Sequence, residues 1–151
     1  MFVMVASFGL MLPSASLYAK QHMAISLKGT SVIPSVITEA KGKGKIFVFP
    51  NRTVSGSIQP YGFVATEAYI HVAAAGKNGP QVITLIKTAN GSFEVPDEAR
   101  LTRAQYKSYM AGKLYVTVRS NRYPQGEIRA QIPLMRTSTS SRYRVKVQHY
   151  Q

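Results

Sequence analysis

The sequence predicts an all-β fold, a Greek-key-like β-sandwich or flattened barrel with one short helix. Short apolar and β-branched segments recur along the chain, and turns rich in Gly, Pro and Asn separate them. Helix signals gather in one place only. With 151 residues, of which 45% are hydrophobic, the chain can bury one core, but it has no cysteine and therefore no disulfide framework.

The chain begins with a segment that is typical of a targeting signal. Residues 1–12 are almost wholly apolar, and Pro13 and small residues follow them. This pattern predicts a signal peptide over residues 1–19, a mature N-terminus between Leu17 and Gln21, and a location outside the cytoplasm: secreted, periplasmic or at the cell surface. The apolar run is too short to span a membrane. A buried N-terminal strand or helix is the alternative.

A β domain is expected over residues 20–134, with about seven to nine strands. Alternating or β-branched stretches place strands at residues 23–28, 41–49, 53–58, 67–73, 81–87, 113–119 and 127–132. The helix is predicted near residues 102–110, because Thr102 and Gln105 have the spacing of a capping box and Gly112 stands where a helix would end.

Two glycines, Gly42 and Gly44, alternate with Lys41, Lys43 and Lys45. As a strand, this stretch would have one face without side chains and one face with three cations. The bare face would let another part of the chain approach closely. A flexible, solvated lysine-rich loop is the alternative interpretation.

Several of these segments together resemble one family, the CHRD domain, first described in chordin and found in many secreted bacterial proteins. The resemblance covers roughly residues 22–134 and rests on the order and spacing of four motifs: an A-Y-I-H strand, an N-G-P turn, an A-G-K-L-Y-V strand and a closing G-E-I-R-A-Q-I strand. The motif residues are Tyr69, His71, Asn78, Gly79, Pro80, Gly112, Tyr115, Gly126, Glu127 and Arg129.

The resemblance implies a binding or structural module and not an enzyme. Where the family often has histidines, this chain has Tyr69 and Arg119, so we expect no bound metal and no cofactor. A superoxide dismutase would need far more than the three histidines present. The remaining pair, His71 and Glu127, is expected to form a structural hydrogen bond if its strands meet. The alternative is an enzyme that uses this pair for acid–base chemistry.

Charge is the other strong signal: 19 Lys and Arg stand against 6 Asp and Glu, which gives a net charge of +13. Basic residues concentrate in Lys41, Lys43 and Lys45, and in an expected extra strand within residues 135–151 that carries Arg142, Arg144 and Lys146. These cations could serve only solubility and protection of a sheet edge. The functional hypothesis is weak, sequence-independent binding to anionic polysaccharide, envelope polymer or extracellular nucleic acid. A subunit of a surface assembly, marked by an exposed apolar patch, is a further alternative.

Overall fold

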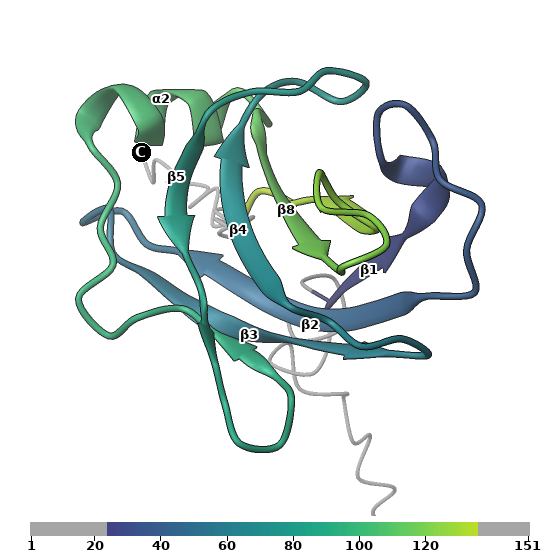
Figure 1. Cartoon of the computed structure of the whole chain (residues 1–151). Coiled ribbons are helices and arrows are strands. Elements are labelled where there is room, and N and C mark those ends of the chain that lie inside the picture. The colour runs from purple at the N-terminus through teal and green to yellow at the C-terminus, as the bar shows by residue number, and fades with distance from the viewer. Residues whose placement is uncertain (1–23, 136–151) are drawn as a thin grey trace, which may run out of the picture.

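The computed structural model describes residues 24–135 (Figure 1). The expected signal peptide and the tail cations Arg142, Arg144 and Lys146 lie outside the described residues. The strands of the described part are β1 (Ala24–Lys28), β2 (Lys41–Val48), β3 (Val54–Tyr61), β4 (Glu67–Val72), β5 (Gln81–Thr84), β6 (Ile86–Lys87), β7 (Phe93–Glu94), β8 (Leu114–Arg119) and β9 (Ile128–Gln131). A 3-10 turn, η1 (Gly29–Ser31), and one helix, α2 (Arg103–Met110), complete it.

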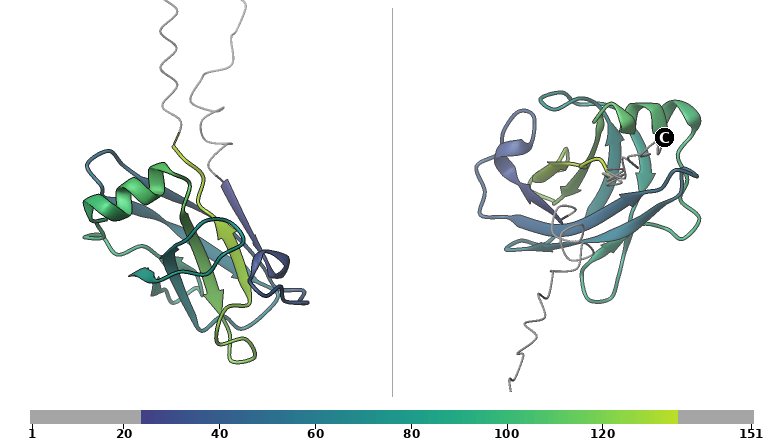
Figure 2. Two further views of the ribbon diagram at one scale, coloured as in Figure 1. Left: turned by 90° about the horizontal axis from the view of Figure 1, so that it is seen from above. Right: turned by 180° about the vertical axis from the view of Figure 1, so that it is seen from behind.

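The strands form one antiparallel sheet in the order β5-β4-β8-β9-β1-β2-β3-β7-β6. Its two outermost strands, β5 and β6, are consecutive in the chain, with Leu85 alone between them. The amide of Leu85 donates to the carbonyl of Ala68 at 3.0 Å, which ties this junction back to β4. The sheet therefore curls into a nearly closed barrel, as Figure 1 and the two views of Figure 2 show. The predicted all-β class with one short helix is confirmed.

Two elements differ from the sequence prediction. The single strand expected over residues 81–87 is split at Leu85, because its first half pairs with β4 and its second half with β7. Strand β7 was not predicted. It contributes only two residues, with Phe93 paired to Ile58 and Glu94 to Ser57, so it is too short for an alternating pattern to be recognised.

Alternate residues of the strands point into the barrel and form its core. The bare glycine face of β2 is part of this interior. A β-carbon added at Gly42 would lie 2.9 Å from Cδ1 of Ile128, and one at Gly44 would collide with the backbone of Ser57. The strand interpretation of the lysine–glycine stretch is therefore correct. Fully buried side chains around it include Leu27, Ile46, Ile58, Ile70, Val116 and Ile128.

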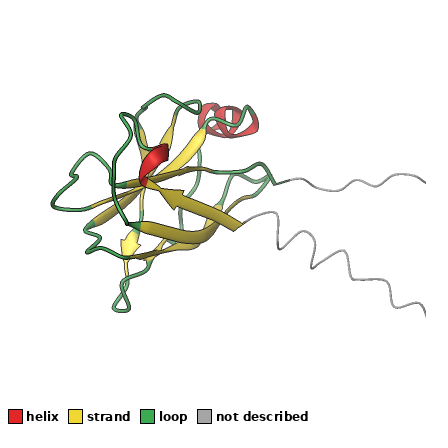
Figure 3. Ribbon diagram, turned by 90° about the vertical axis from the view of Figure 1, so that its right-hand side faces the viewer, coloured by secondary structure: helices red, strands yellow, loops and turns green. Residues whose placement is uncertain are grey.

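Helix α2 begins with the capping box predicted from the sequence. The amide of Gln105 donates to the hydroxyl of Thr102 at 3.1 Å, and the Gln105 side chain accepts from the amide of Thr102 at 2.8 Å. Tyr109 packs into the core, and Gly112 follows with a φ of 73°, which favours glycine. Figure 3 shows the helix at the periphery of a body made of strands. Within residues 24–135, no helix is long and apolar enough to cross a membrane.

Candidate functional site

His71 lies on β4, with a side chain that is almost completely buried. Its Nδ1 is 3.1 Å from the carbonyl oxygen of Gly79, which can only accept, so Nδ1 carries the proton and donates. Its Nε2, 3.0 Å from Oγ1 of Thr117, then accepts from that hydroxyl. The imidazole also stacks on the ring of Tyr115, with centroids 4.8 Å apart and planes 7° from parallel. Both ring nitrogens are therefore occupied.

Burial lowers the pKa of His71 from its ordinary value, because desolvation penalises the charged imidazolium. The hydrogen bond to Gly79 opposes this shift, and the positive charges of Arg119 and Arg129 add to it. The side chain is thus a neutral imidazole near pH 7. A neutral histidine with two fixed partners is suited to holding structure and has no free nitrogen to exchange a proton with a substrate.

Arg129, on β9, is only 2% exposed and has no carboxylate partner in the described part of the chain. Its guanidinium lies 3.5 Å from the ring centroid of Tyr115. It donates to the side-chain oxygen of Asn78 at 3.2 Å and to the carbonyl of Ala74 at 3.4 Å. Burial lowers the pKa of Arg129, and the guanidinium is stabilised by the aromatic face and by neutral oxygen acceptors in place of an ion pair.

The loop of residues 73–80 is held by this network. The hydroxyl of Tyr115 accepts from the Gly79 amide at 2.9 Å and lies 3.3 Å from the Gly79 carbonyl. Asn78 donates to the carbonyl of Ile33 at 2.7 Å. Gly79 has no room for a side chain, since a β-carbon there would collide with the carbonyl of Val72. We call the residues His71, Asn78, Gly79, Tyr115 and Arg129 the loop brace.

The expected hydrogen bond between His71 and Glu127 does not form. Glu127 precedes β9 and accepts from the hydroxyl of Thr38 at 2.6 Å. In the register of the sheet, His71 pairs with Tyr115, whereas Val118 pairs with Ile128. Glu127 therefore lies at the level of Arg119, four residues from that of His71, or about 13 Å along the strands. The acid–base pair on which the enzyme alternative rested is absent.

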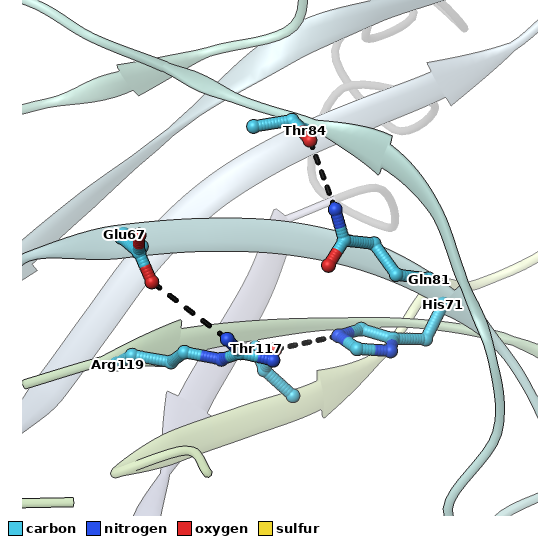
Figure 4. A network of polar contacts seen from close by, with 6 residues as sticks. All are labelled: Glu67, His71, Gln81, Thr84, Thr117 and Arg119. Atoms are coloured by element: carbon cyan, nitrogen blue, oxygen red, sulfur yellow. Dashed lines mark hydrogen bonds and ion pairs between the residues drawn. The ribbon is translucent and has the colours of Figure 1, made fainter. Parts of the chain in front are cut away.

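Tyr69 and Arg119 come together across β4 and β8. The guanidinium of Arg119 lies 4.4 Å from the ring centroid of Tyr69, and its NH1 is 3.7 Å from a carboxylate oxygen of Glu67. Figure 4 shows this ion pair on the same face as the His71–Thr117 hydrogen bond. The two positions where the family often has histidines are therefore occupied by a cation–π pair of Arg119 and Tyr69. Among residues 24–135, no three His, Asp or Glu side chains gather as metal ligands. The expected absence of bound metal stays a prediction.

The other motif residues act through the backbone. Pro80 directly precedes β5, and Gly112 stands two residues after the last residue of α2. Gly126 has a φ of 137° and closes a turn in which its amide donates to the carbonyl of Tyr123 at 3.1 Å. These positions need conformations that suit proline or glycine, so they place loops and carry no chemistry.

Lys41, Lys43 and Lys45 all alternate with the inward-facing residues of β2. The neighbouring strand β1 adds an exposed cation that the sequence analysis missed, because Lys28 pairs directly with Lys41. Strand pairing alone brings Lys28 here, so no local sequence pattern could have identified it. We call these four residues the lysine face. The ammonium of Lys43 lies 5.6 Å from the ring centroid of Tyr61 on β3.

A groove of about 440 Å³ runs beside the lysine face. Gly44 and Gly56 line it together with Lys43 and Lys45, and Phe47, Ser57 and Gln59 add apolar and hydrogen-bonding surface. In the strand pairing, the acidic residue nearest to this surface is Glu94 of β7. It pairs with Ser57 along the edge of β3 that faces away from β2. The surface therefore combines concentrated positive charge with a shallow concavity.

The family model of the CHRD domain matches residues 23–132, which is most of the chain. No curated protein and no solved structure matches the chain.

Proposed function

The chain belongs to the CHRD domain family, and we propose that it acts as an extracellular binding module whose lysine face contacts anionic polymers. The motif residues support a binding role over catalysis. His71 has both nitrogens occupied by partners within the protein, and Glu127 lies far from it. What the motifs build is a rigid scaffold.

The observation that carries the proposal is the pairing around the lysine face. Residues paired with the three β2 lysines are Ser26, Ala24, Lys28, Tyr61, Gln59 and Ser57, and none of them is acidic. Successive charges along β2 are about 7 Å apart, and the neighbouring strand is about 4.8 Å away. Like charges directly opposite one another, as in Lys28 and Lys41, are unfavourable in a sheet. A bound polyanion would relieve that repulsion, with an affinity that falls as salt rises.

Retention on immobilised heparin and on DNA, each eluted with a salt gradient, tests the proposal. A variant with Lys41, Lys43 and Lys45 changed to Ser removes the β2 charges. The matched control changes three other exposed lysines to Ser and removes the same net charge: Lys77, Lys107 and Lys113.

We expect the β2 variant to elute at clearly lower salt than both wild type and the control. Equal shifts in the two variants would mean that only the overall charge matters. If the wild-type protein is not retained even at low salt, the charges serve solubility alone. Melting temperatures should stay nearly unchanged, since exposed charges contribute little to folding.

The tail cations Arg142, Arg144 and Lys146 are proposed as a second contact patch from the sequence alone. Changing this trio to Ser, alone and together with the β2 trio, tests whether the patches act jointly. Two patches on one polymer should lower the elution salt of the combined variant beyond that of either trio. Identical elution of the tail variant and wild type would remove the tail from the binding surface.

A further inference from the structure

A second cavity, of about 510 Å³, lies where three loops meet at one end of the barrel. The loops precede β2, connect β3 to β4, and connect β8 to β9. The mouth of a β-barrel is a common position for a small-molecule site. This cavity contains neither the lysine face nor the loop brace, and the polyanion proposal makes no use of it.

Its polar centre is the carboxylate of Glu127, a side chain that is only 5% exposed. One oxygen of this group accepts from Thr38. No ion pair joins Glu127 to a cation anywhere in residues 24–135. Glu39 and Arg122 also line the cavity, but both are exposed and opposite in charge, and neither pairs with Glu127. Arg119 lies at the level of Glu127 in the sheet, but its NH1 is paired with Glu67 at 3.7 Å instead.

An uncompensated buried carboxylate is unusual, since buried charges in proteins are normally paired or bound to a metal. It is more unusual in a chain of net charge +13, which has many cations that could have been its partner. The supporting hydroxyl of Thr38 orients the carboxylate without neutralising it. The second carboxylate oxygen has no hydrogen-bond partner among the described residues, and because Glu127 lines the cavity, a cation that enters it can reach this oxygen.

The cavity wall indicates what that cation is attached to. Ile37 is 97% exposed and Val64 is 79% exposed, and Phe63 packs partly against the core beside them. Two large aliphatic side chains held in solvent at the rim of a cavity provide apolar contact to a ligand that enters it.

We propose that this cavity binds an organic cation, an alkylammonium group on an apolar stem, with the ammonium at Glu127 and the stem against Ile37 and Val64. The same chemistry is offered by a free aliphatic amine and by a lysine side chain of a partner protein.

The test is a titration of the full chain with n-pentylamine, followed by amide chemical shifts in NMR spectra. Saturable shifts at Thr38, Val64 and Glu127 are expected. Pentanol has the same stem without the charge and should bind at least about tenfold more weakly, because hydrogen bonds to charged groups are the stronger ones. Nα-acetyl-lysine amide separates the sources: tighter binding than pentylamine indicates a lysine side chain, and weaker binding indicates a free amine.

The diagnostic variant is Glu127→Gln, which retains an oxygen to accept from Thr38 and loses the charge. Its matched control is Glu39→Gln, at an exposed carboxylate that lines the same cavity. Pentylamine affinity should fall about tenfold to a hundredfold in the first variant and stay within about twofold in the second. Equal losses in both would show only a general attraction of cations, and would overturn the proposal. The proposal would also be overturned if the amide chemical shifts fail to saturate with pentylamine, or if calcium causes identical shifts.

Thermal unfolding separates a binding role of Glu127 from a structural one. Glu127→Gln should melt at or above the temperature of wild type, because it removes an uncompensated buried charge. A clearly lower melting temperature would make the carboxylate a structural element and overturn the inference. A second variant, Ile37→Ser with Val64→Ser, alters only exposed side chains. It should weaken pentylamine binding while the melting temperature holds, and unchanged affinity would contradict the apolar contact.

Discussion

Removing one oxygen atom from the loop brace should measurably destabilise the protein. In Tyr115→Phe the aromatic ring remains, so the stacking with His71 and the contact with Arg129 are retained. The hydroxyl that accepts from the Gly79 amide at 2.9 Å is lost. The Gly79 carbonyl keeps its bond from His71, so the unpaired group is the amide alone. Leaving such a buried donor without a partner costs about 1–3 kcal/mol.

For a part-buried amide we take the lower half of that range, about 1–2 kcal/mol, which in a chain of this size lowers the melting temperature by about 2–8 °C. Thermal or urea unfolding gives the value. Tyr61→Phe is the matched control, since Tyr61 is 45% exposed, and its loss should be close to zero. Amide hydrogen exchange at Gly79 should accelerate only in the Tyr115 variant. Equal melting of the two variants would refute the assignment of this hydroxyl as a structural acceptor.

Three further predictions concern His71, the glycines of the 73–80 loop and the cap of α2. The pKa of His71 lies below its unfolded value of about 6.5, so the unfolded state binds more protons near and below that pH. The contribution of His71 to stability should therefore be fully present above pH 6.5 and be lost as the pH falls. In His71→Gln, the free energy of unfolding should depend less steeply on pH between about pH 5 and 7. Gly79→Ala should lower stability more than Gly76→Ala. A β-carbon at Gly79 meets the Val72 backbone, whereas one at Gly76 meets nothing within 4 Å and costs only the strain of its φ of 77°. The comparison of melting curves decides this. Thr102→Ala should cost about 1 kcal/mol by loss of the helix cap, and an unchanged urea midpoint would speak against it.

The sequence predicted local features well because their causes are local. The bounds of α2 depend on a capping box and a following glycine within a few residues of the helix. The strands depend on alternation, which is visible within one segment. Contacts between segments depend on register, and no pattern within a segment contains it. The sequence separations of 36 for Gly79 and Tyr115, and of 89 for Thr38 and Glu127, show how far apart the partners are in the chain.

The incorrect pairing of His71 with Glu127 has the same origin. Both belong to motif strands, and β4 and β9 are each hydrogen-bonded to β8, so proximity of the strands was a sound expectation. Their positions along β8 were unknown from the sequence. Likewise, the pairing of Lys28 with Lys41 follows from the β1–β2 register, and adding this cation enlarges a surface that the sequence outlined from β2 alone.

Glu127 and Arg129 are buried charged residues only two positions apart in the chain. They show the difference between a residue that holds the fold and one that we propose to bind a ligand. Arg129 has an aromatic face and neutral oxygen acceptors around it, so its charge is stabilised within the protein. Glu127 has one hydroxyl and an open cavity. Both are almost fully buried, so burial alone does not distinguish them. The difference lies in whether the folded chain supplies partners, and where it does not, a partner from outside completes the site.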